Sequence, residues 1–191
     1  MTSKVSNALR ALFAAVVATS LMACADGVPF EPDSRIAPAG DAAFSRNPDL
    51  GICQKLNVPA GSKLAFHALG IGVQIYQWNG TSWVFVAPSA KLYADAGGHG
   101  LVGTHFGGPT WLSNSGSRVV GTVANDGRCV VDVNSIPWLL LNAVASGQGI
   151  FERTTLIQRL NTVGGNAPST PGSVVGEEVE VPYTADYYFY R

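Results

Sequence analysis

Short runs of β-forming residues, separated by turn residues, recur from residue 64 to the end of the chain. The clearest pair is residues 64–78 and 81–86, because the Asn79-Gly80 dipeptide between them is the strongest short-range signal for a β-hairpin. Further β-rich runs cover residues 101–106, 118–123, 129–133, 151–160, 178–181 and 183–190. Many short, closely spaced strands predict an all-β domain, either an antiparallel β-sandwich or a small barrel.

Residues 137–145 fit two kinds of element. Ser135 as a cap, Pro137 near the start and Gly147 at the end would suit a short helix. The uninterrupted apolar run from Trp138 to Leu141 favours a buried strand instead. We expect the strand, although the pattern alone does not exclude the helix.

Residues 1–23 are typical of a bacterial export signal. Lys4 and Arg10 precede an apolar stretch, residues 11–23, which is shorter than the roughly 20 residues of a membrane-spanning helix. The stretch ends in Leu21-Met22-Ala23-Cys24, which resembles the lipobox of bacterial lipoproteins, with a small residue before the cleaved bond and a thiol that takes the lipid. We expect lipidation at Cys24; the alternative is ordinary signal-peptide cleavage beside an incidental cysteine.

The expected location follows from this signal. Ala25, not aspartate, follows Cys24, which favours the outer membrane or periplasm in a Gram-negative host. Residues 24–49 contain several prolines and show no apolar periodicity, so they predict a flexible, disordered tether. A single β-domain is expected over residues 50–191.

Charge narrows the possible partners. The chain has a net charge of −1, only 13% of its residues are charged, and it has no run of lysine or arginine. The electrostatic footprint of a nucleic-acid-binding protein is therefore missing. No polybasic membrane patch occurs either, so membrane attachment is expected only through the lipid at Cys24.

Two cysteines remain once Cys24 is set aside. Cys53 and Cys129 form an even pair, which in an oxidising compartment predicts one disulfide. Two buried free thiols are the alternative. No Cys-x-x-Cys pair occurs, so neither a zinc ribbon nor thioredoxin-type redox chemistry is indicated.

His105, directly before the run Phe106-Gly107-Gly108-Pro109, is the first candidate for chemistry. It could act as an acid or base if Asp132, Asp186 or Glu152 lay beside it, or it could pack the loop through a hydrogen bond. A metal site of His99, His105 and Asp95 is conceivable, but the spacing matches no standard motif, so no metal is predicted. No nucleophile elbow, dinucleotide fingerprint or phosphate loop occurs, so no catalytic residue and no cofactor is assigned.

The aromatic residues suggest a binding surface. Exported β-domains that bind sugars or apolar molecules use rings with a few polar groups beside them. Packing in a small β-domain is the alternative explanation for any single ring. We expect a shared ligand-binding surface, with Arg159 paired to Asp186, because a lone buried charge is costly. Its residues are His105, Trp111, Arg159, Tyr183 and Asp186.

Six blocks of the chain, in order, resemble one family of exported bacterial and fungal proteins, known as domain of unknown function 3455. The blocks are GVQIY at 72–76, WVFVAP at 83–88, VGTHFGGPTW at 102–111, IPWLLL at 136–141, IQRLNT at 157–162 and VPYTADY at 181–187. The resemblance implies no activity. Members often have a cysteine after the Ile-Tyr strand and another in the C-terminal third, where this chain has Trp78 and Ser173. Cys53 and Cys129 are then the available pair.

Three functions remain open from the sequence. The favoured one is a non-enzymatic module, held to the envelope by lipid, that binds a small ligand or a glycan. The second is a hydrolase or lyase that uses His105 as acid or base. The third is a structural envelope lipoprotein without a ligand. A deep pocket that contains His105 and at least two rings would favour binding or catalysis, whereas a filled core would favour the structural role.

Overall fold

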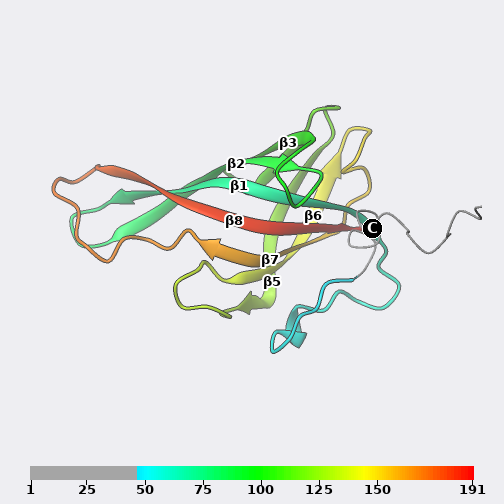
Figure 1. The fold of residues 1–191 in the computed structure, drawn as a ribbon, viewed down its shortest axis with the longest axis horizontal. Coiled ribbons are helices and arrows are strands. Elements are labelled where there is room, and N and C mark those ends of the chain that lie inside the picture. Colours follow the sequence, from blue (N-terminus) through cyan, green and yellow to red (C-terminus); the bar gives the residue numbers. More distant parts are fainter. Residues whose placement is uncertain (1–46) are drawn as a thin grey trace, which may run out of the picture. The chain divides into compact units, whose positions relative to one another are not determined.

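The computed structural model describes residues 47–191 (Figure 1). The expected signal peptide, the lipidation site at Cys24 and nearly all of the expected tether lie outside these residues. The described elements are a short 3-10 helix, η1 (Gln54–Leu56), and the strands β1 (Leu64–Trp78), β2 (Trp83–Tyr93), β3 (Leu101–Phe106), β4 (Thr110–Ser113), β5 (Arg118–Cys129), β6 (Trp138–Ser146), β7 (Leu156–Gly164) and β8 (Glu178–Tyr190). Over residues 47–191, no helix has the length and apolar character needed to cross a membrane.

The eight strands form one closed antiparallel barrel in sequence order. Each strand pairs with the next along the chain, and β8 pairs with β1 along nearly its whole length, from Gln77–Glu178 to Leu64–Tyr190. Closure pairs the outer edges of the first and last strands, which removes the exposed edge of an open sheet. The all-β prediction is confirmed, and of the two expected architectures the chain adopts the barrel.

Side chains alternate between the inside and the outside of the barrel, as the two-residue period of a strand requires. In β8, Tyr183, Ala185, Tyr187 and Phe189 belong to the core inside the barrel. Tyr188, between two of them, belongs instead to a second cluster on the outer face. This alternation decides which of the expected site residues can meet.

One end of the barrel, here called the closed end, is filled by aromatic side chains. It is the end at which β1 begins and β8 finishes. The loop between β6 and β7 places Phe151 there with no exposed surface, 4.6 Å from Phe189 and 6.2 Å from Phe66 between ring centroids. The opposite end, here called the open end, contains the β1–β2 and β3–β4 connections.

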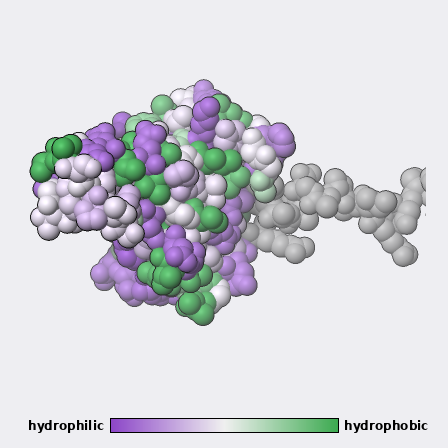
Figure 2. Space-filling model, turned by 60° about the vertical axis from the view of Figure 1, so that its left-hand side comes forward, coloured by the Kyte–Doolittle hydropathy of each residue, from purple (hydrophilic) through white to green (hydrophobic). Residues whose placement is uncertain are grey.

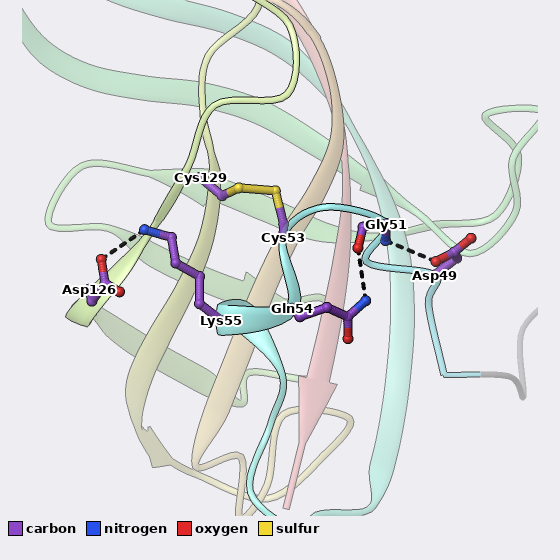
Figure 3. Close-up of a disulfide and its surroundings, with 7 residues drawn as sticks. All are labelled: Asp49, Gly51, Cys53, Gln54, Lys55, Asp126 and Cys129. Carbon is purple, nitrogen blue, oxygen red and sulfur yellow. Dashed lines mark hydrogen bonds and ion pairs between the residues drawn. A yellow bond between two sulfur atoms is a disulfide. The ribbon is translucent and has the colours of Figure 1, made fainter.

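The segment before β1 covers part of the outer face. Leu50, Cys53 and Leu56 pack against Leu140, Leu160 and Tyr190 of β6, β7 and β8. A disulfide joins Cys53 to Cys129, the last residue of β5, with 5.9 Å between their Cα atoms (Figure 3). Lys55 adds an ion pair with Asp126 at 2.8 Å on the same side. The predicted disulfide is confirmed.

The strand predictions succeed where the pattern is long and fail at boundaries. Residues 64–78, 101–106 and 138–146 are strands, so the strand expected in place of a helix near Trp138 is confirmed. The hairpin at Asn79 is also present, but its loop has four residues, and Gly80 alone is at positive φ there. The strand expected at 129–133 is wrong beyond residue 129, where β5 ends. The strand expected at 151–160 begins only at Leu156, and residues 151–155 form a loop. The short strand β4 was not expected.

The surface carries no single continuous apolar face in the view that turns the left-hand side of Figure 1 forward. Apolar residues are interspersed with polar ones there (Figure 2). The exposed apolar residues most relevant to the site are Phe85 and Val86 of β2 and Val123 of β5, which stand at the open end.

Candidate functional site

A cavity of about 410 Å³ occupies the half of the barrel toward the open end. Its wall combines rings and aliphatic side chains with a few polar groups. The polar side chains are those of Gln74, Tyr76, His105, Arg128, Arg159 and Asn166, and the larger apolar ones are those of Phe85, Val86, Trp111, Val123, Ile136, Leu139 and Leu141. Because Phe85, Val86 and Val123 are also exposed, the cavity is reachable from solvent.

His105 and Trp111 form the aromatic centre of this wall. The β3–β4 hairpin, turned by residues 107–109, pairs the two residues directly across the strands. Their rings stack with centroids 4.2 Å apart and an interplanar angle of 10°. His105 also meets the edge of Tyr187 at 5.2 Å. His105 therefore sits on a regular, inward-facing strand position, and only the residues that follow it form the expected irregular turn.

His105 is a neutral base at physiological pH. Burial lowers its pKa to about 3, the hydrogen bond to the Thr110 carbonyl opposes this, and the charge of Arg159 adds to it. Its Nδ1 lies 2.9 Å from the carbonyl oxygen of Thr110, which can only accept, so Nδ1 carries the proton. That assignment leaves Nε2 as an acceptor. The hydrogen bond across the turn is what the loop-packing alternative predicted.

Arg159 brings a positive charge inside the barrel without a counterion. Its Nη2 donates to the carbonyl of Pro137 at 2.8 Å. Its Nε is buried without a hydrogen-bond partner, and no carboxylate in residues 47–191 forms an ion pair with it. Burial lowers the pKa of Arg159, although the nearby phenols of Tyr187 and Tyr183 act in the opposite direction.

Among residues 47–191, three buried donors in the wall make no hydrogen bond of good geometry, although Gln74 and Arg159 interact with the hydroxyls of Tyr183 and Tyr187. These donors are Nε of Arg159, Nε1 of Trp111 and Nε2 of Gln74. Trp111 and Gln74 are only 1% and 2% exposed. An unpaired buried donor costs about 1–3 kcal/mol, so these donors favour an acceptor group placed in the cavity.

Two glycines make room for the rings of this region, each on the strand next to the one that carries the ring. A side-chain carbon at Gly121 of β5 would lie 3.0 Å from both the Trp111 ring and Leu141. A carbon at Gly70 of β1 would lie 2.5 Å from the Tyr187 ring. Both glycines therefore let a large ring lie against the backbone of the next strand.

The structure separates Asp186 from the other expected site residues. Arg159 pairs in register with Tyr187, and Leu160 pairs with Asp186, so Arg159 points inward where Asp186 points outward. On the outer face, Asp186 accepts from Asn161 at 2.8 Å and lies 3.1 Å from His67 Nε2. The expected Arg159–Asp186 pair is wrong, because a shift of one residue along a strand moves a side chain to the other face.

Of the five expected residues, His105, Trp111 and Arg159 share the cavity wall. Tyr183 faces the barrel interior nearby, where its hydroxyl lies 3.0 Å from that of Tyr187, but it does not line the cavity. Three of the residues therefore lie on one surface, as expected, and Asp186 lies on the opposite face of the sheet.

The acid–base partners proposed for His105 also lie elsewhere. Asp132 accepts hydrogen bonds from Asn134 and Ser135 in the loop before β6, and Glu152 pairs with Arg153. His99 is exposed beside Asp95, away from the buried His105. Within residues 47–191, no group of three or more metal-binding side chains is placed to hold an ion.

Sequence reasoning missed Gln74, Tyr76 and Arg128, which also line the cavity. For Gln74 a signal exists: it interrupts the β-rich run of β1 with an amide on the face that, by alternation, also carries Tyr76 and Trp78. Arg128 gives no such signal, because a break in pairing between Val123 and Arg128 sets the direction of its side chain.

Fold and site together define a small, closed, eight-stranded antiparallel barrel with an internal cavity at one end. The chain belongs to the family described as "Protein of unknown function (DUF3455)", which matches residues 59–191. The resemblance seen in the six sequence blocks is thereby confirmed. No curated protein and no solved structure matches this chain.

Proposed function

We propose that this protein is a non-enzymatic binding module that holds a small molecule in the barrel cavity. The observation that carries the proposal is the cavity itself, about 410 Å³ in size, with His105 and several rings in its wall. Ligand sites are typically concave, mostly apolar and within roughly 300–1,000 Å³, with a few polar groups that fix orientation. Eight-stranded barrels are wide enough to hold one small ligand.

A purely structural role accounts for this interior less well. A barrel selected only for stability would fill its open half as it fills the closed end, where Phe151 packs against Phe189. Instead, the open half keeps a cavity and three unsatisfied donors. A bound ligand would supply the missing contacts.

A hydrolase or lyase centred on His105 has weaker support. The Nδ1 atom of His105 donates its proton to the carbonyl oxygen of Thr110. None of the expected acidic partners, Asp132, Asp186 and Glu152, lies beside the ring. We assign His105 the role of a neutral ring of the cavity wall, stacked on Trp111, that packs against the ligand. A small molecule with an apolar body fits better than a glycan, because rings and aliphatic side chains make up most of the wall.

We further propose that the barrel is exported and anchored by lipid at Cys24, at the outer membrane or in the periplasm. The lipobox-like sequence Leu21 to Cys24 supports the anchor. The Cys53–Cys129 disulfide supports an oxidising compartment. In a bacterial host, labelled palmitate should enter the wild-type chain and not the Cys24→Ser variant; equal labelling of both would refute the anchor.

Saturable uptake of a neutral fluorescent dye, N-phenyl-1-naphthylamine, tests the binding function. The full chain is used with Cys24→Ser, so that no acyl chain of its own takes up the dye. Val123→Trp places a large ring at an inward-facing position of the wall and should abolish binding. Val144→Trp, on the outer face of neighbouring β6 where Val144 is 75% exposed, is the matched control and should bind normally.

Two results would refute the binding function. One is the absence of saturable binding in the parent chain. The other is equal binding by the Val123→Trp and Val144→Trp variants, which would place the dye outside the cavity.

A further inference from the structure

We propose that the natural ligand is a small organic anion, an apolar and preferably aromatic body that carries one carboxylate. This inference rests on the proposed binding function and specifies its ligand class. It follows from the charges, the unsatisfied donors and the apolar surfaces of the cavity.

The charged side chains of the cavity wall are both positive. Arg128 and Arg159 both line the cavity, and no aspartate or glutamate of residues 47–191 does so. The strand register places both arginines in one row across β5, β6 and β7, on either side of Leu139. Burial is the main cause that lowers the pKa of Arg159, and the charge of Arg128 adds to it. Like charges in one cavity favour an anion between them.

Some hydrogen-bond donors of the wall lack acceptors. The unsatisfied buried atoms here are all N–H donors, on Arg159, Trp111 and Gln74. A carboxylate offers two oxygens with about four acceptor positions and matches the planar geometry of a guanidinium. Small rotations of Arg159 and Gln74 would direct their donors to such a group. A cationic ligand would leave these donors unpaired and add repulsion.

The remaining wall selects an apolar body. The stacked rings of His105 and Trp111 lie on one side, and Leu139 and Leu141 come from β6. This surface would be left bare by a small inorganic anion such as phosphate. It favours a ligand whose ring packs on the apolar wall while its carboxylate reaches Arg159.

Three ligands of one skeleton test the assignment: 2-naphthoate, its neutral amide 2-naphthamide, and 2-naphthylmethylammonium. Calorimetric titration of the full chain carrying Cys24→Ser should show naphthoate binding at least tenfold more tightly than naphthamide, and the cation more weakly than either. Arg159→Gln should reduce the preference, so that naphthoate binds this variant within twofold of the affinity that the same variant has for naphthamide. Arg118→Gln, an exposed charge on β5 at the closed end, is the matched control and should keep the preference.

Arg128→Gln removes an exposed arginine at the cavity and is the second variant, in case Arg159→Gln does not fold. It should reduce the preference for naphthoate about threefold. Equal affinity for naphthoate and naphthamide would overturn the anion assignment and leave the binding function intact. A preference that survives both arginine variants would overturn it as well. Failure of all three ligands and of the neutral dye would instead refute the binding function.

Discussion

The two ends of the barrel use aromatic residues in opposite ways. At the closed end, Phe66, Phe151 and Phe189 contact one another and fill the interior. At the open end, Trp111 stacks on His105 and leaves a cavity beside them. The first arrangement gains stability from close packing, whereas the second gives up part of that gain and keeps space and unpaired donors.

With the proposed function, this difference assigns stability and binding to different halves of the barrel. Contacts on the outer face stabilise part of the open half, because the disulfide joins the end of β5 to the segment that covers that face. Such support allows the interior of that half to remain unfilled. Substitutions at the closed end and at the disulfide should therefore change stability, and substitutions in the cavity should mainly change binding.

Removal of the disulfide should have the largest effect on stability. The linked residues are 76 positions apart, and a loop of this size corresponds to about 4 kcal/mol of chain entropy in the unfolded state. The Cys53→Ala/Cys129→Ala variant should lose about that much unfolding free energy, measured by urea denaturation with tryptophan fluorescence. Cys24→Ser serves as the control. A loss below about 1 kcal/mol would show that the outer cover does not depend on the covalent link.

Phe151→Ala should be nearly as costly, and it tests the closed end directly. Phe151 has no exposed surface and contacts both Phe66 and Phe189. Removing a buried phenyl ring costs about 3–5 kcal/mol. If the ends are independent, dye binding by the fraction that remains folded should be unchanged. Loss of dye affinity in proportion to stability would show that the two ends are coupled.

The pH dependence of stability should report on His105 at the open end. Burial lowers its pKa to about 3, against roughly 6.5 in the unfolded chain. Between these values the unfolded state binds a proton that the folded state does not, so stability falls as the pH drops below about 6.5. The fall should reach about 2 kcal/mol at pH 5.

His105→Asn removes this dependence and keeps a donor for the Thr110 carbonyl. Denaturation at pH 7 and pH 5 should show a difference smaller by about 2 kcal/mol than in the parent chain. His99→Asn, which changes an exposed ring, should leave the difference unchanged. An unaltered pH dependence in the His105 variant would mean that His105 is not the group responsible.

Much of the fold could be predicted from the sequence, because local residue patterns determine where strands form. The turn residues around Asn79-Gly80 and the alternation along 64–78 predicted a hairpin that the structure contains. The types of residue in the site were also recognisable, because a histidine beside Gly-Gly-Pro and an arginine in an apolar strand are unusual in a core. His105, Trp111 and Arg159 do meet.

What could not be predicted depends on register between distant strands. Asp186 is outside because it pairs with Leu160 and not with Arg159, a difference of one residue. Arg128 reaches the cavity after an irregularity in β5 that has no clear sequence signature. The closure of β8 on β1, which makes a barrel of the sheet, is likewise a long-range contact that no local pattern reveals.

Phe85→Ala should have the smallest effect on stability, and it is the counterpart of Phe151→Ala. Phe85 is 50% exposed at the rim of the cavity, where its ring meets the edge of Tyr76 at 5.8 Å. The ring leaves water only in part, so its removal should cost less than about 1 kcal/mol in urea denaturation. Affinity for the neutral dye should nevertheless fall severalfold, because the ring forms part of the wall. A loss of stability similar to that of Phe151→Ala, with unchanged dye affinity, would reverse the roles assigned to the two ends: the rim would then belong to the packed core, and binding would have to be sought elsewhere on the barrel.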